Sequence, residues 1–208
     1  MKKPKLFLDF DGTVFNWHKF VPWLDNVLVE HFQTAPGAFM ESYHDHHKVV
    51  YGDLRLYHHN RHAKAVTGLP WKRVGEVISS STHPHFCFAE VHAVLDLLST
   101  QFEDIRLLTF GRDEFQRYKI NLCDTLSTLD IHVVGEPKGD FLAREFADEP
   151  GILVDDKYPL ALPDHWQHIW INREEQLLKP KKIKQNVWQI SSLEQLPKLL
   201  ASGIIDTK

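Results

Sequence analysis

The first apolar run of the chain leads into the sequence Leu-Phe-Leu-Asp-Phe-Asp-Gly-Thr-Val at positions 6–14. Its apolar start predicts a buried strand, and Asp9 and Asp11 follow where that strand ends. Side chains two residues apart lie on the same side of an extended chain, so both carboxylates should face one space. Two acids this close repel each other, and burial adds a desolvation cost. A purely structural role for this pair is therefore difficult to explain. The alternative is an exposed loop in which Asp and Gly are turn formers.

Five more short apolar runs, rich in β-branched and aromatic residues, predict the remaining strands of a sheet. With the first strand at 5–9, they occupy 105–109, 131–134, 152–155, 168–171 and 187–190. Helical periodicity at 89–99 and 113–126, and a capped segment near 192–200, fill several of the intervals. This alternation predicts an α/β fold with a doubly wound parallel sheet covered by helices on both faces.

Polar residues follow other strands of the predicted sheet as well. Thr109 ends the second strand, Lys138 lies just before a helix, and Asp155 and Asp156 end another strand. In a parallel sheet these carboxyl ends share one edge, where ligands bind. Four close carboxylates at that edge demand a cation, and their oxygen atoms suit Mg²⁺. A hydroxyl and an ammonium beside a metal ion suit a phosphoryl group.

The interval from about Val14 to His85 interrupts the alternation of strands and helices. It is rich in His, Trp and Tyr, and its pattern predicts helices at 16–32, 37–59 and 71–80. We therefore expect a core made of residues 1–15 and 84–208, and a small all-helical insert, residues 16–83, placed after the first strand.

The order of these features resembles the haloacid dehalogenase (HAD) superfamily of phosphohydrolases. The matching features are Asp-x-Asp-Gly-Thr at 9–13, a strand-terminal Thr109, Lys138 and the acidic pair at 155–156. The resemblance covers residues 4–14 and about 86–200. It implies a Rossmann-like HAD core, and the insert resembles the cap domains that many members carry after the first motif.

The resemblance also implies a role for each matching residue. Asp9 would be the nucleophile that forms an aspartyl-phosphate, and Asp11 would protonate the leaving oxygen and later accept a proton from water. Thr109 and Lys138 would bind phosphoryl oxygens.

For the metal ion, the resemblance implies a set of oxygen ligands. Asp9, the main-chain carbonyl of Asp11, and Asp155 would hold Mg²⁺, with Asp156 acting through water or through hydrogen bonds to the ligands.

The function implied by this resemblance is Mg²⁺-dependent hydrolysis of a small phosphorylated metabolite. Leu-Val-Asp-Asp-Lys at 153–157 resembles the fourth motif of 5'(3')-deoxyribonucleotidases, so the substrate could be a nucleotide. The alternatives are a phosphotransferase or phosphomutase with the same aspartyl-phosphate chemistry, and a non-catalytic phosphate-binding protein. Asp11 argues against the dehalogenase branch, whose members lack the second Asp.

The composition restricts the classes of partner and the cellular location that we expect for this protein. The 24 Lys and Arg residues against 28 Asp and Glu residues give a net charge of −4, which makes a nucleic acid polymer an unexpected partner. No stretch approaches the roughly 20 apolar residues that cross a bilayer. Two cysteines without a CxxC pair exclude a disulfide framework and favour a cytoplasmic location.

Some features admit more than one interpretation. His58 and His62 have the spacing of metal ligands on one helix face, but no third ligand is placed by spacing, so surface histidines are the preferred interpretation. A middle option is that some histidines line a substrate cleft beside Arg55 or Arg61. The aromatic residues Trp17, Phe20 and Trp23 could stack on a ring or form the core of the insert. The basic run at 179–184 suits a solvated connector better than a nucleic acid site.

Overall fold

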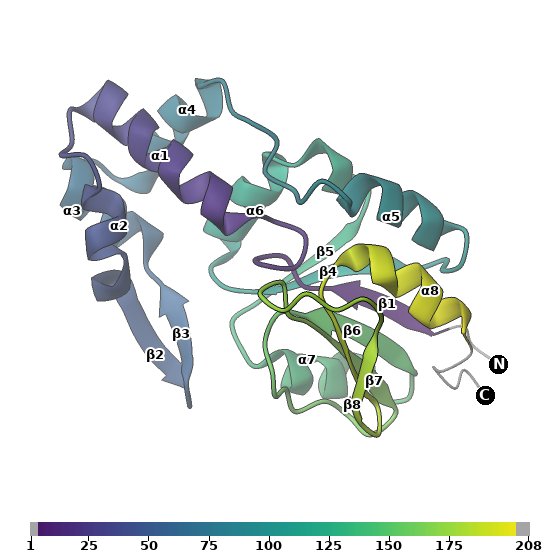
Figure 1. The fold of residues 1–208 in the computed structure, drawn as a ribbon. Helices are drawn as coiled ribbons and strands as arrows, with labels where there is room; N and C mark the ends of the chain where they lie inside the picture. The colour runs from purple at the N-terminus through teal and green to yellow at the C-terminus, as the bar shows by residue number, and fades with distance from the viewer. Residues whose placement is uncertain (1–3, 203–208) are drawn as a thin grey trace.

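A seven-stranded sheet forms the centre of the structure, a computed structural model that describes residues 4–202 (Figure 1). The strand order is β5-β4-β1-β6-β7-β9-β8, and every neighbouring pair is parallel except β8 and β9. The strands are β1 (Lys5–Leu8), β4 (Ile105–Phe110), β5 (Asp130–Val134), β6 (Gly151–Asp155), β7 (Trp166–Ile171), β8 (Lys181–Lys184) and β9 (Val187–Ile190). The predicted α/β class and its six core strands are confirmed.

The strand β8 was not predicted from the sequence. It contains most of the basic run at 179–184 and pairs antiparallel with β9 at the edge of the sheet. The interpretation of this run as a connector is therefore wrong for β8. Lysines are a common feature of edge strands, because their charge discourages pairing with another chain.

Helices cover both faces of the sheet. Alternation along β1 sends Leu6 and Leu8 to one core cluster and Phe7 to another. Residues of α5 (Val91–Ser99), α6 (Asp113–Asn121) and α8 (Leu196–Ala201) belong to the first cluster, and residues of α7 (Lys138–Glu145) belong to the second. Figure 1 shows α7 on the opposite side of the sheet from α5 and α8.

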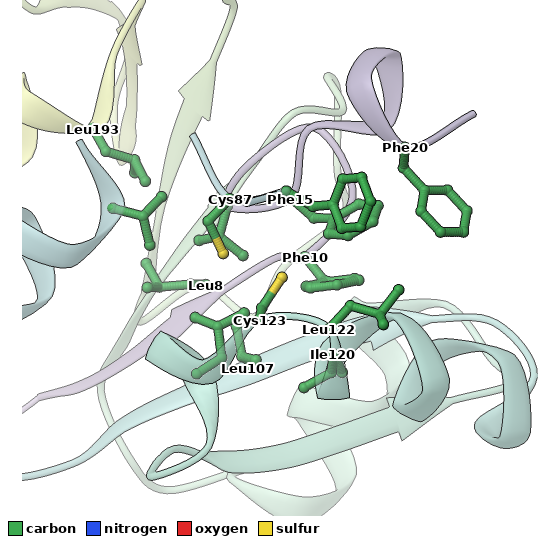
Figure 2. Close-up of a cluster of buried hydrophobic side chains, with 14 of the residues drawn as sticks. Leu8, Phe10, Phe15, Phe20, Cys87, Leu107, Ile120, Leu122, Cys123 and Leu193 are labelled. Atoms are coloured by element: carbon green, nitrogen blue, oxygen red, sulfur yellow. The ribbon is translucent and has the colours of Figure 1, made fainter. Parts of the chain in front are cut away.

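The two cysteines lie in the first of these clusters. Figure 2 shows the sulfur atoms of Cys87 and Cys123 facing each other between Leu8, Leu107 and the ring of Phe10. Both cysteines are buried and free. They act here as small apolar side chains of the core.

The insert leaves the sheet after β1 and returns before α5 (Figure 1). Its elements are α1 (Trp17–Phe32), α2 (Ala38–Ser42), the 3₁₀ turn Tyr43–His46, β2 (His47–Tyr51), β3 (Leu54–Tyr57), α3 (His59–Thr67) and α4 (Trp71–Ser80). The predicted helices at 16–32 and 71–80 are confirmed. The division of the chain at residues 16 and 83 stays a prediction, and residues 1–3 and 203–208 of the predicted core lie outside the described range.

The predicted helix at 37–59 is wrong, so the insert is mainly helical and not all-helical. The segment contains the antiparallel hairpin β2–β3, whose two-residue turn is Gly52-Asp53. Val49, Val50 and Tyr51 favour a strand because their side chains are β-branched or aromatic. Gly52 adopts a φ of +49°, and Gly-Asp between two short runs is a recognised hairpin signal. Helix α3 begins only after the hairpin.

No helix within residues 4–202 combines the length and the apolar character needed to span a membrane.

Candidate active site

Three carboxylates converge at the carboxyl edge of the sheet. Asp9 directly follows β1, and Asp155 ends β6, the parallel neighbour in which Val154 pairs with Leu8. The register therefore places Asp9 beside Asp155, and Asp156 follows. One carboxylate oxygen from each of the three residues lies within 4.8 Å of the others. The structure brings these predicted site residues together.

Lys138 joins two of these carboxylates. It begins α7, and its Nζ donates to Asp9 Oδ1 at 2.5 Å and to Asp155 Oδ2 at 2.6 Å. The other oxygen of Asp155 accepts a hydrogen bond from the backbone N–H of Lys157 at 2.8 Å. Lys138 thus fixes the carboxylates of Asp9 and Asp155 relative to each other.

The charges of this cluster are unbalanced. Burial raises the pKa of Asp9 and Asp156, and nearby carboxylates act in the same direction. Burial alone would lower the pKa of Lys138, but the attraction of Asp155 and Asp9 outweighs it and raises that pKa. The buried ammonium of Lys138 and the exposed ammonium of Lys157, which pairs with Asp156 at 2.9 Å, face three carboxylates. The cluster keeps a negative excess that a divalent cation can offset.

The donor set fits the Mg²⁺ that the fold implies. All three side chains offer oxygen atoms, the ligands that this ion prefers, and they come from two adjacent loops. The side chain of Asp11 is not part of the cluster, so Asp11 could contribute only its main-chain carbonyl, which stays a prediction.

The side chain of Asp11 is held by helix α6 instead. Nζ of Lys119 donates to both Asp11 oxygens, at 2.5 and 2.6 Å, and Nε2 of Gln116 donates to Oδ2 at 3.1 Å. The Asp11 side chain keeps 35% of its surface exposed, whereas that of Lys119 keeps 2%. The predicted acid–base residue is therefore accessible from one side and fixed from the other.

The ammonium of Lys119 lies in an aromatic environment. Burial lowers the pKa of Lys119, and the charge of Asp11 opposes that effect. Four ring centroids lie 5.0–5.5 Å from Nζ, close enough for cation–π attraction; the rings belong to Phe10, Phe15, Trp17 and Phe115.

Sequence reasoning missed Lys119 and Gln116. Lys119 is four residues after Phe115 and three before Leu122, so it lies on the predicted apolar stripe of its helix. A lysine on a buried stripe needs a counter-charge, and this signal could have identified it. Gln116 carries no comparable signal.

Arg173 is a third missed residue, and it fixes the loop that contains Gly12 and Thr13. Its Nε and Nη2 donate to the carbonyls of Gly12 and Thr13, at 3.0 and 2.6 Å, and its Nη1 pairs with Glu90 at 2.7 Å. Gly12 is required in this loop because its φ is +80° and a Cβ would lie 2.7 Å from Asp156 Oδ2. A single arginine in a loop gives no pattern to predict this role.

Thr109, the remaining predicted site residue, is buried near the end of β4, the strand that neighbours β1 on its other side. It therefore lies at the same edge of the sheet as the carboxylates. Its contact with a phosphoryl oxygen stays a prediction.

The histidine pair proposed as metal ligands has other contacts. His58 precedes α3 and its Nδ1 bonds to Arg112 Nη2 at 2.9 Å. Both ring nitrogens of His62 bond within the protein, to Tyr57 and Ser42, so none remains for a metal ion. Phe20 is fully buried, as expected for the core of the insert.

Comparison with known proteins gives the class of the fold. No model of a known protein family matches the sequence, and no curated protein matches it. A structure from Burkholderia xenovorans, described as a haloacid dehalogenase-like hydrolase, matches with a TM-score of 0.65 and 14% identity, over 98% of this chain and 99% of that one. A magnesium-bound structure from Bacillus subtilis, described as the HAD-hydrolase YfnB, has a TM-score of 0.62 and 14% identity, over 96% of this chain and 99% of that one. A haloacid dehalogenase-like family hydrolase from Xanthomonas campestris has a TM-score of 0.56 and 14% identity, over 97% of this chain and 96% of that one.

The chain therefore has the fold of the HAD-like hydrolases, as its motifs indicated. The similarity extends over nearly the whole described chain, the insert included. At 14% identity it establishes the fold, and the chemistry must be argued from the site.

Proposed function

We propose that this protein is a Mg²⁺-dependent phosphomonoesterase that works through an aspartyl-phosphate on Asp9. The observation that carries the proposal is the set of three carboxylates whose oxygens lie within 4.8 Å of one another, with Lys138 bridging Asp9 and Asp155. The magnesium in the structure of YfnB supports the choice of the ion.

In the first step, a carboxylate oxygen of Asp9 attacks phosphorus, and the bond from phosphorus to the ester oxygen breaks. The departing oxygen takes the proton of the Asp11 carboxyl group, so the alcohol leaves neutral. The contacts from Lys119 and Gln116 hold the Asp11 side chain in one place.

In the second step, the carboxylate of Asp11 accepts a proton from water, and the water oxygen attacks the phosphorus of the aspartyl-phosphate. The bond to Asp9 breaks, which releases inorganic phosphate and restores both acids. Lys138 would offset the negative charge on the phosphoryl oxygens, and the hydroxyl of Thr109 would bind one of these oxygens. When bound by Asp9, Asp155 and Asp156, Mg²⁺ would supply further positive charge for the phosphoryl group.

A phosphate-release assay tests the proposal. Sugar phosphates, nucleotides, small phosphorylated metabolites and p-nitrophenyl phosphate are incubated with the protein and Mg²⁺, with and without EDTA. We expect Mg²⁺-dependent release from at least one ester, and none from Asp9→Asn. Absence of release from the whole panel would contradict the proposal. Transfer of phosphate to an added alcohol in place of release would identify a transferase or mutase.

A further inference from the structure

A small cavity opens beside Asp11, between the hairpin β2–β3 and the start of α6. Its volume is about 110 Å³, and we call it the inner cavity. Its lining includes Asp11, Lys119, His47, Arg55 and Arg112. Because Asp11 is the proposed acid for the leaving group, the part of a substrate that departs would lie here.

The inner cavity carries an excess of positive charge. Asp11 is the only acidic residue in its lining, and Lys119 already pairs with it. The side chain of Arg55 makes no hydrogen bond or ion pair within residues 4–202. Arg112 donates one hydrogen bond to the ring nitrogen of His58, which is a neutral acceptor. Both guanidinium groups are therefore available to an anion.

The reacting phosphoryl group does not account for these two arginines. That group would be bound at the carboxylate cluster, where Lys138 is its cation. Neither Asp9 nor Lys138 lines the inner cavity. Arg55 and Arg112 thus point to a different anionic group.

One residue of this lining also has a buried polar atom without a hydrogen-bond partner in the described structure. Gln116 lines the inner cavity and is 5% exposed, and its Oε1 has no hydrogen bond although Nε2 donates to Asp11 and to the Phe110 carbonyl. A buried acceptor of this kind is satisfied by a donor from a ligand or water. A hydroxyl on the departing group would supply that donor.

The positive charge continues outward from the inner cavity. Arg112 also lines a larger cavity of about 590 Å³, together with Arg61, Lys64 and Glu114. Glu114 pairs with His59 at 3.0 Å, so the cationic groups prevail there as well.

We propose that the substrate is a phosphomonoester whose leaving group carries a second anionic group, a carboxylate or a phosphate, which Arg55 and Arg112 bind. This inference rests on the proposed function and specifies its substrate class.

Two pairs of esters test the inference, each pair differing by one anionic group. The first is 3-phosphoglycerate and glycerol 3-phosphate, and the second is fructose 1,6-bisphosphate and fructose 6-phosphate. We expect kcat/KM to favour the more anionic ester of at least one pair. In Arg55→Gln and Arg112→Gln that preference should fall by roughly ten- to a hundredfold, the effect of losing a charge-assisted hydrogen bond. The pair that responds shows whether the second anion is a carboxylate or a phosphate.

Matched variants and a binding measurement complete the test. Lys48→Gln on the same hairpin and Arg117→Gln on α6 remove exposed cations that line neither cavity, and they should keep the preference. Equal kcat/KM within both pairs, or an unchanged preference in both cavity variants, would overturn the inference.

Calorimetric titration of the Asp9→Asn protein with the same four esters separates this inference from the proposed function. Tighter binding of the more anionic ester, lost on adding Arg55→Gln, would support the inference even if no ester were hydrolysed. Equal binding within both pairs would refute it.

Discussion

Asp9 and Asp11 are separated by one residue, yet their side chains have different partners. Asp9 faces Lys138 and the other acids of the metal cluster, whereas Asp11 faces Lys119 and Gln116 of α6. A nucleophile and an acid–base group need separate positions, and these different partners hold the two carboxyl groups apart. The sequence Asp-x-Asp brings the two acids close together, and α6 and α7 provide each acid with a different partner.

At this scale, Lys119→Met tests the positioning of Asp11. Methionine keeps the contacts with the surrounding rings but removes the ammonium that holds both Asp11 oxygens. We expect kcat to fall by roughly ten- to a hundredfold for an alkyl phosphate, part of the usual value of acid–base catalysis. The loss should be smaller for an aryl phosphate, whose leaving group needs less protonation. Steady-state kinetics on both substrates measures it.

The exposed Arg117, on the same helix, provides the control. Arg117→Gln removes a cation that pairs, within residues 4–202, with Asp113, and it should change neither rate. Equal losses on alkyl and aryl phosphates in Lys119→Met, or no loss at all, would contradict the positioning role.

The sequence predicts single residues when a pattern marks them. Asp9, Thr109, Lys138 and the pair at 155–156 could be found because each follows a strand that is itself recognisable. Arg173 could not, because its contacts are to carbonyl groups of residues about 160 positions away and depend on the folded path of two loops.

At the scale of elements, helix α7 carries Lys138 to the site, and Gly139 sets its position. A Cβ at Gly139 would lie 1.8 Å from the backbone oxygen of Ala161, in the loop after β6. Only glycine permits this approach, so Lys138 reaches Asp9 because α7 starts close to that loop.

Gly139→Ala is therefore expected to lower the free energy of unfolding by about 1–3 kcal/mol and to reduce turnover, since the start of α7 must shift. Urea unfolding and steady-state kinetics measure both effects. Gly75 in α4 is the matched control, because its Cβ would meet Trp71 only at an ordinary 3.7 Å. Gly75→Ala should leave stability unchanged or raise it by up to about 1 kcal/mol. Comparable effects of the two changes would refute this account.

Within the insert, His62 makes stability depend on pH. Burial lowers its pKa to about 4, from an ordinary value of 6.5. The unfolded chain therefore binds a proton at this residue at a higher pH than the folded protein. Its contribution to stability is complete above pH 6.5 and is lost as the pH falls towards 4.

His62→Gln should reduce the pH dependence of the unfolding free energy in this window. The reduction should reach at most about 1.4 kcal/mol per pH unit, the slope for one proton. Urea unfolding at a series of pH values measures it. Identical slopes in the two proteins would show that His62 does not carry the effect.

The elements differ in how far the sequence predicts them. Helices α1 and α4 have clear apolar periodicity and were predicted. The hairpin β2–β3 was missed because both strands are short and half exposed, and the surrounding helical pattern suggested a continuous helix. The turn Gly52-Asp53 was the available signal.

At the scale of the whole molecule, the parallel sheet assembles the site. The loops after β1 and β6, and the start of α7, are distant in sequence. They meet at one edge because β1, β6 and β5, the strand before α7, run parallel in one sheet. This rule made the site predictable. The arginines of the inner cavity depend on the placement of the hairpin, which no strand pattern predicts.

Because three acids gather at one edge, we expect the stability of the whole fold to depend on Mg²⁺. An ion that binds the folded protein and not the unfolded chain stabilises it by mass action, by about 2.7 kcal/mol at a concentration a hundred times Kd. Millimolar MgCl₂ should therefore raise Tm, and EDTA should reverse the change. Asp155→Asn should abolish the shift, whereas Asp113→Asn, which removes an exposed carboxylate, should keep it. An undiminished shift in Asp155→Asn would place the ion elsewhere.

The most direct test of the central claim is to trap the phosphorylated protein. An activated aryl phosphate is mixed with Asp11→Asn in the presence of Mg²⁺ and quenched with acid, and the site of phosphate attachment is determined. Since Asp11 is needed to activate water, the account predicts that the aspartyl-phosphate accumulates on Asp9 in Asp11→Asn and does not form in Asp9→Asn. A phosphorylated Asp9→Asn protein, or an Asp11→Asn protein with unchanged steady-state turnover, would contradict the account.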